Sequence, residues 1–136
     1  MGKHATAIWN GTGKEGTGNI TLQSNLLDHV KYSYQSRYED GPGTNPEELV
    51  AAAHASCFTL KLSFILNAAG FTADELETTC DITLADGAIT KSHLTLKAKV
   101  PGISQEKFDE CAKDAKENCP ISKLLNTNIS LEASLV

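Results

Sequence analysis

The stretch GTNPEELVAAAHASCFTLKLSFILNAAG, residues 43–70, decides how this chain folds. Asn45 has the side chain of a helix N-cap, Pro46 suits the first helical position, and the two acids that follow favour the positive end of a helix dipole. Apolar and small residues then recur every three or four positions as far as Ala69, and Gly70 is typical of the residue that ends a helix. The pattern predicts one long, largely buried helix.

Short segments that alternate small or polar with apolar residues lie before this helix, at residues 5–9 and 18–22. Alternation of this kind predicts antiparallel strands. Residues 11–16 between them, GTGKEG, fit the G-x-G-x-x-G pattern of dinucleotide-binding loops, but such a loop must open a helix. A strand follows instead, so we expect a hairpin loop whose glycines provide the positive φ angles of a turn.

After the long helix the same signals predict two strands joined through Asp86-Gly87, a helix capped by Ser104, a further helical turn and a closing strand. These elements fall at about residues 77–84, 93–100, 104–118, 119–125 and 128–135. The order of strands and helices predicts a single α+β domain over residues 1–136, with the helices on one side of antiparallel sheet.

The charge of the chain excludes some classes of partner. Its net charge is −5 over 136 residues, and it has no basic run of the kind that binds nucleic acids or anionic membranes. The longest strongly apolar stretch, residues 60–69, is shorter than the roughly 20 residues of a membrane span, and no apolar secretory signal opens the chain. We therefore expect a soluble, cytoplasmic protein.

Four cysteines, Cys57, Cys80, Cys111 and Cys119, are the candidates for chemistry. They form no C-x-x-C pair and the four histidines are scattered, so we expect neither a zinc site nor a bound cofactor. Cys80 in a predicted strand and Cys111 in a predicted helix read as small buried hydrophobes and receive no role.

Cys57 lies inside the long helix among small and apolar residues, where burial alone would raise its pKa and leave it inert. A reactive Cys57 therefore needs a cation, and Arg37 is the single arginine of the chain. Its guanidinium either leans over the helix, pinned by Glu47, or forms a weak surface ion pair with Glu39 or Asp40. The sequence leaves both alternatives open.

Cys119 precedes Pro120 at the start of the short helix, where backbone N–H groups and the helix dipole favour a thiolate. The electrostatics of a helix start therefore favour Cys119 over Cys57 as the thiol of low pKa. The alternative is that Cys119 is an unreactive capping residue. Two such thiols would make a dithiol able to cycle through a disulfide. Sequence spacing does not show that they meet.

Three segments together carry a resemblance to a known family: residues 43–58, Ser36-Arg37-Tyr38-Glu39 before them, and Cys119-Pro120-Ile121-Ser122 after them. They resemble the OsmC/Ohr family of osmotically inducible and organic hydroperoxide resistance proteins, and the Ala-Ala-His-Ala before Ser56 is closer to the OsmC branch. The resemblance implies antiparallel sheets packed on two main helices, and an intertwined homodimer with active sites at the subunit interface.

The resemblance also implies a cysteine-based peroxidase that reduces organic hydroperoxides, and hydrogen peroxide as a further substrate, with an external thiol or dithiol as reductant. In that activity Cys57 would be the peroxidatic cysteine and Cys119 the resolving one, which reverses the local preference. Arg37 would lower the pKa of Cys57 and Glu47 would hold Arg37, while Glu48 faces solvent. Apolar residues near the site would favour organic substrates, or would simply pack the core: Tyr38, Phe58 and Ile121.

Two readings from other classes compete with the enzyme. One is a non-catalytic dimer that binds an apolar small molecule or partner, with cysteines that serve only packing. The other is a redox sensor, for which the acidic chain offers no evident effector surface. The readings differ on whether Cys57 reacts with peroxide.

Overall fold

Residues 1–39 and 41–136 are described by the structure, a computed structural model. They form two compact units, Met1–Leu49 and Val50–Val136, and we describe each unit by itself. The long helix α2, Pro46–Ala68, begins in the first unit and continues into the second. The expectation of a single domain over residues 1–136 stays a prediction.

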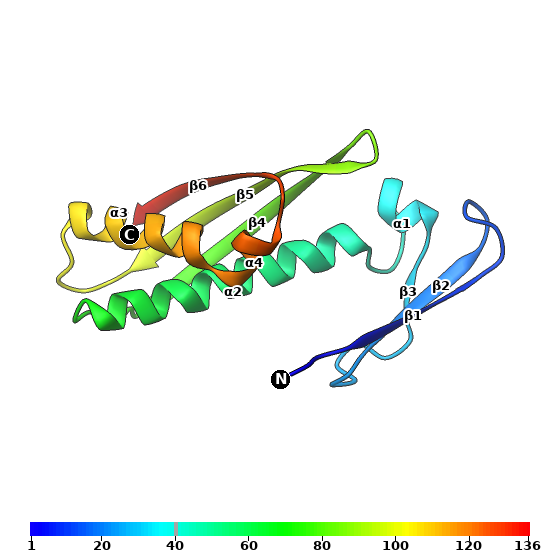
Figure 1. The fold of residues 1–136 in the computed structure, drawn as a ribbon, viewed down its shortest axis with the longest axis horizontal. Helices are drawn as coiled ribbons and strands as arrows, with labels where there is room; N and C mark the ends of the chain where they lie inside the picture. Colours follow the sequence, from blue (N-terminus) through cyan, green and yellow to red (C-terminus); the bar gives the residue numbers. More distant parts are fainter. Residues whose placement is uncertain (40) are drawn as a thin grey trace. The chain divides into compact units, whose positions relative to one another are not determined.

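The first unit contains a three-stranded antiparallel sheet in the order β1-β2-β3 (Figure 1). Its strands are β1, Ala5–Asn10, β2, Thr17–Leu22, and β3, Val30–Tyr32. The register of β1 and β2 places Asn10 opposite Thr17, so the glycine-rich segment between them closes a hairpin. This confirms the predicted hairpin loop, in which Gly11 has the expected positive φ, 100°, and Gly13 and Gly16 do not.

A short helix that the sequence did not predict follows β3. Helix α1, Tyr34–Tyr38, is nucleated by a reciprocal capping box, in which the Ser36 N–H donates to the Ser33 hydroxyl and the Ser33 N–H donates to the Ser36 hydroxyl. The box satisfies N–H groups that have no partner within the helix. Ser33 to Tyr38 therefore end the sheet and turn the chain toward α2.

Helix α2 forms where the sequence predicted it. The Asn45 side chain accepts a hydrogen bond of 2.7 Å from the Glu48 N–H, as an N-cap does, and Pro46 is the first helical residue. At the other end Gly70 has a φ of 92°, the left-handed conformation that stops a helix. By length and composition alone α2 is long and apolar enough to cross a membrane, so the apolar stretch is longer than residues 60–69, but core helices of soluble proteins have the same character.

The second unit holds a sheet in the order β4-β5-β6 and two further helices (Figure 1). Asp86 and Gly87 join β4 to β5 with φ angles of 52° and 77°, and positive values at both positions are those of a type I′ hairpin turn. Ser104 caps α3 through a hydrogen bond from the Lys107 N–H. The elements are β4, Glu75–Ala85, β5, Ala88–Lys99, α3, Gln105–Asn118, α4, Pro120–Leu124, and β6, Asn128–Leu135.

The closing strand corrects one expectation. The register pairs Lys91 with Asn128 and Ala98 with Leu135, so β6 runs parallel to β5 and the sheet is mixed rather than wholly antiparallel. The reason is the connection: α3 and α4 carry the chain from the end of β5 back to its beginning, and a strand that follows such a crossover is parallel to the one before it.

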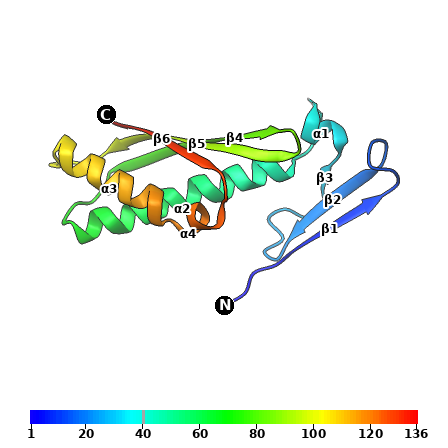
Figure 2. The ribbon, with the colours of Figure 1, turned by 45° about the horizontal axis from the view of Figure 1, so that its top comes forward.

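All the helices of the second unit lie on one side of its sheet, as predicted (Figure 2). Phe58, Leu62 and Leu66 of α2 are wholly buried at intervals of four residues, and α3 adds Phe108. The sheet contributes alternate residues of its central strand, because side chains in a strand point to opposite faces in turn. From β5 these are Leu94, Leu96 and Ala98.

A polar cluster is enclosed in this unit. His54 of α2 is wholly buried, its Nδ1 lies 2.6 Å from the Ser92 hydroxyl of β5, and its Nε2 lies 2.8 Å from the Ser122 hydroxyl of α4. A neutral imidazole donates from one nitrogen and accepts at the other, and hydroxyls rotate to suit either arrangement. Burial lowers the pKa of His54, which favours this neutral form.

His54→Gln is expected to flatten the dependence of stability on acid pH. The pKa of His54 is lowered from 6.5 in the folded protein, so the unfolded chain binds the proton first as pH falls. The contribution of His54 is therefore complete above pH 6.5 and is lost below it, by at most about 1.4 kcal/mol per pH unit. Urea denaturation of both proteins from pH ~7.5 to ~5.5 measures the difference. If the free energy of unfolding changed with pH in the same way for both proteins, the lowered pKa of His54 would be contradicted.

Candidate functional site

Cys57 and Cys119 meet in the second unit, although 62 positions separate them in the chain. Their Sγ atoms lie 3.1 Å apart, with the Cys119 thiol as donor. This is a hydrogen-bonded dithiol and not a disulfide, whose sulfurs are about 2.05 Å apart. Cys57 is half-buried and Cys119 is wholly buried. The pair is placed so that a small movement can join the two sulfurs.

Two helix ends fix the position of Cys119. Its N–H donates to the Ala115 carbonyl and closes α3, while its Sγ accepts a hydrogen bond of 3.4 Å from the Ser122 N–H at the start of α4. Pro120 takes the first helical position, where a missing N–H costs nothing. The capping role expected as an alternative is therefore present, and it coexists with the contact to Cys57.

The surroundings of Cys57 within its own unit disfavour the thiolate. Burial raises the pKa of the Cys57 thiol, a hydrogen bond from the Ile121 backbone opposes the rise, the Cys119 thiol adds to it, and the charge of Lys61 lowers it again. The net direction is upward. Since the thiolate is the nucleophile, Cys57 needs further positive charge to react rapidly at neutral pH.

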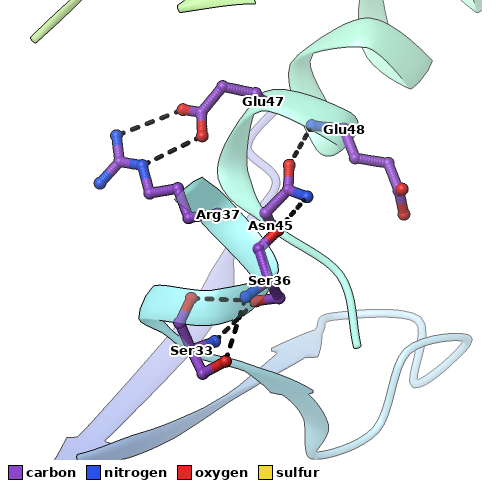
Figure 3. Close-up of polar contacts among 6 residues, drawn as sticks. All are labelled: Ser33, Ser36, Arg37, Asn45, Glu47 and Glu48. Carbon is purple, nitrogen blue, oxygen red and sulfur yellow. Dashed lines mark hydrogen bonds and ion pairs between the residues drawn. The ribbon is translucent and has the colours of Figure 1, made fainter. Parts of the chain in front are cut away.

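Arg37 and Glu47 form a bidentate ion pair in the first unit (Figure 3). The Arg37 Nε donates to Glu47 Oε1 at 3.0 Å and its Nη2 donates to Oε2 at 3.2 Å. The hydrogen bond and the charge of Glu47 raise the pKa of Arg37, so the guanidinium stays charged. Two of its five N–H groups are used in this pair, which leaves donors for a second anion.

Asn45 explains why the two charged residues face each other. Its Nδ2 donates to the Ser36 carbonyl at 2.7 Å, while its Oδ1 caps α2 (Figure 3). One amide therefore ties Ser36 of α1, next to Arg37, to the first turn of α2, next to Glu47. Geometry of this kind fixes a bidentate pair more firmly than two free surface side chains would.

Of the partners considered for Arg37, the described residues show Glu47. Glu39 is exposed and Arg37 pairs with Glu47 instead, whereas the expected alternative with Asp40 lies outside the described residues. Glu48 is exposed, as expected, and accepts a hydrogen bond from the Thr44 hydroxyl at 3.0 Å.

The remaining candidates divide between packing and exposure. Cys111 is buried in the core from α3, as a small hydrophobe would be, and Cys80 is half-buried on β4. Phe58 is wholly buried, which favours the packing alternative for this residue. Ile121 packs against the same core, and Tyr38 of the first unit is 53% exposed. In residues 1–39 and 41–136 no group of three or more His, Cys, Asp or Glu is placed to hold a metal.

The buried trio of His54, Ser92 and Ser122 went unnoticed in the sequence. A signal was available: His54 lies four residues before Phe58 and eight before Leu62, on the buried stripe of the helix. A histidine on such a stripe must find hydrogen-bond partners inside the protein. Its serine partners come from β5 and α4, which only the fold brings together.

Comparisons with known proteins agree with these features. The family described as OsmC-like protein matches residues 39–134. The chain is 42% identical to Peroxiredoxin OsmC of Escherichia coli strain K12, over 98% of this chain and 96% of that protein. It is 31% identical to the organic hydroperoxide resistance protein OhrB of Bacillus subtilis strain 168, over 87% of this chain and 88% of that protein.

Solved structures share the architecture. The crystal structure of OhrB from Bacillus subtilis superposes with a TM-score of 0.65 at 26% identity, over 98% of both chains. An OsmC-like protein from Vibrio cholerae, 17% identical, superposes with a TM-score of 0.75 over 98% of this chain and 99% of the other. The family match, the full-length relative and these folds together show that this chain belongs to the OsmC family.

Proposed function

We propose that this protein is a cysteine-based peroxidase that reduces organic hydroperoxides, and hydrogen peroxide as a further substrate, to alcohols or water. The observation that carries the proposal is the approach of the Cys57 and Cys119 sulfurs to 3.1 Å. The names of two relatives, a peroxiredoxin and an organic hydroperoxide resistance protein, support the same chemistry. Both relatives align with this chain over most of its length.

We assign the peroxidatic role to Cys57 and the resolving role to Cys119. Cys57 is half-buried and open to a small substrate, whereas Cys119 is wholly buried. The Cys57 thiolate attacks the outer oxygen of R–O–O–H, the O–O bond breaks, and R–O⁻ takes a proton and leaves as the alcohol. Cys57 becomes a sulfenic acid, Cys119 displaces water from it, and the disulfide forms. Two thiols of an external reductant then restore the dithiol.

Arg37 in this proposal provides the charge that Cys57 lacks within its own unit. A guanidinium keeps its charge when buried and has donors left after pairing with Glu47. Beside Cys57 it would lower the pKa of the thiol and stabilise the oxygen that leaves with the electrons of the broken bond. Glu47 acts as the positioning residue for Arg37.

We also propose a homodimer that works in the cytoplasm. Leu60 and Phe64 lie one turn apart on α2 and are 59% and 63% exposed, an apolar face that a second copy of the chain would cover. The reducing thiols that regenerate the dithiol are those of a reducing compartment. No prosthetic group takes part in this cycle.

Cys57→Ser is expected to abolish the reduction of cumene hydroperoxide with dithiothreitol as reductant, because it removes the nucleophile. Cys119→Ser is expected to form the Cys57 sulfenic acid once, but no intramolecular disulfide. Trapping with dimedone followed by intact mass measures the sulfenic acid. Cys111→Ala is the matched control, since this thiol is buried in the core and the sulfur paired with Cys57 is that of Cys119, and it should retain turnover. If the thiols of the wild-type protein were unchanged after peroxide treatment, the peroxidase hypothesis would be wrong and the binding-protein hypothesis would be favoured.

Arg37→Met is expected to slow alkylation of Cys57 at pH 7 by about 10- to 100-fold, because it removes the positive charge that stabilises the thiolate. Glu47→Gln is expected to slow it by about tenfold, because it breaks the bidentate pair that holds the Arg37 guanidinium in place. The pH dependence of alkylation by iodoacetamide in the Cys119→Ser background measures the pKa of Cys57. Glu48→Gln is the control, because this neighbouring carboxylate is exposed and bonded to Thr44 instead. Equal rates for all four proteins would remove Arg37 from the mechanism.

Phe64→Asp is expected to give monomers, because a charge on the apolar face of α2 cannot be buried against a second copy without a large desolvation cost. Sedimentation equilibrium should find a wild-type mass twice that of the 14.5 kDa chain and a variant mass equal to it. Leu26→Asp is the control, since Leu26 is 85% exposed and lies away from α2 in the sequence. A monomeric wild type would overturn the dimer.

A further inference from the structure

One imidazole connects the helix that carries Cys57 to the helical turn that carries Cys119. His54 lies on α2, three residues before Cys57, and its Nε2 is 2.8 Å from the Ser122 hydroxyl of α4. The backbone N–H of the same Ser122 donates to Cys119 Sγ at 3.4 Å. Ser122 therefore holds the sulfur of Cys119 with its backbone while His54 holds Ser122 by its side chain.

The other nitrogen of the ring is anchored as well. His54 Nδ1 lies 2.6 Å from the Ser92 hydroxyl, and that hydroxyl lies 3.2 Å from the Cys80 sulfur on β4. Both hydroxyl groups come from buried residues, so water does not compete for these bonds. A ring bonded at both ends has one orientation, and α4 takes its position from a rigid point on the sheet.

A second histidine–serine pair shows what a purely architectural contact looks like. His93 Nδ1 lies 2.6 Å from the Ser130 hydroxyl, on residues that face each other directly in the ladder of β5 and β6. Backbone hydrogen bonds of the sheet already set that spacing. His54 and Ser122, in contrast, come from two helices, and α4 is only five residues long.

The geometry matters because a sulfenic acid has two fates. Attack by the Cys119 thiol gives the disulfide and water, whereas attack on a second R–O–O–H gives the sulfinic acid and a second alcohol. The first path is intramolecular, so its rate depends on how often the two sulfurs are within reach. Moving from the 3.1 Å contact to a bond needs a shift of about 1 Å.

We propose that His54 is a positioning residue for the resolving step: through Ser122 it holds the Cys119 sulfur at Cys57, so that the sulfenic acid is captured before a second peroxide oxidises it. The proposal rests on the proposed function. It assigns to His54 and Ser122 an effect on the second step of the cycle and none on the attack of Cys57 on peroxide.

Ser122→Ala tests this with little disturbance, because it removes the hydroxyl and keeps the backbone N–H that Cys119 accepts from. His54→Leu removes the ring, and His54→Gln restores a side chain able to bond to a hydroxyl. Single-turnover measurements give the rate at which Cys57 is oxidised and the rate at which the sulfenic acid becomes a disulfide. Intact mass, with a gain of about 32 Da for the sulfinic acid, follows overoxidation as cumene hydroperoxide is raised.

In Ser122→Ala and His54→Leu we expect the oxidation rate of Cys57 to stay within about twofold of wild type and disulfide formation to slow about tenfold, which is the loss of one buried hydrogen bond. The peroxide concentration that overoxidises half of the protein should fall by the same factor. His54→Gln should recover part of the loss. The matched control Ser130→Ala, which breaks the other histidine–serine pair, should behave as wild type.

The inference would be overturned if Ser122→Ala needed the same peroxide concentration as wild type for half-overoxidation. It would also be overturned if Cys57 oxidation and disulfide formation slowed equally in all the variants. A wild type in which Cys57 is not oxidised at all would instead overturn the proposed function, and the inference with it. The two failures are therefore told apart in the same experiment.

Discussion

The packing of α2 across the sheet of the second unit is the contact on which the rest depends. Phe58, Leu62 and Leu66 are wholly buried there, and each side chain contributes about 1.5–3 kcal/mol by leaving water. Rotation or sliding of the helix would expose all three at once. The register that keeps them buried also fixes His54 one turn before Phe58 and Cys57 directly beside it, so the hydrophobic contact sets where the chemistry is possible.

Local signals made most of the fold predictable. Asn45 and Gly70 mark the ends of α2, and Asp86-Gly87 marks the hairpin between β4 and β5, because a cap or a turn needs only its own few residues. The prediction of a wholly antiparallel sheet was wrong for β6, since the direction of this strand depends on a crossover through α3 and α4 rather than on any residue of the strand. Helix α1 was missed because it is one turn long and is stabilised by the exchange between Ser33 and Ser36.

The candidate site shows the same division between local and distant causes. The sequence singled out both thiols and the only arginine, yet 62 positions separate the sulfurs, and only the packing of α4 near α2 makes them neighbours. Local electrostatics favoured Cys119 as the reactive thiol, from its place at a helix start. Burial favours the opposite assignment, the one we propose, because Cys119 is wholly buried and Cys57 is half-buried.

Cys119 ends one helix with its backbone and begins the next with its sulfur. The Ser122 N–H donates to the Cys119 sulfur, and a thiolate accepts such a hydrogen bond more strongly than a neutral disulfide sulfur because it carries a negative charge. Oxidation and the capping of α4 are then thermodynamically linked: whatever strength this hydrogen bond loses when the disulfide forms, the reduced state gains in relative stability.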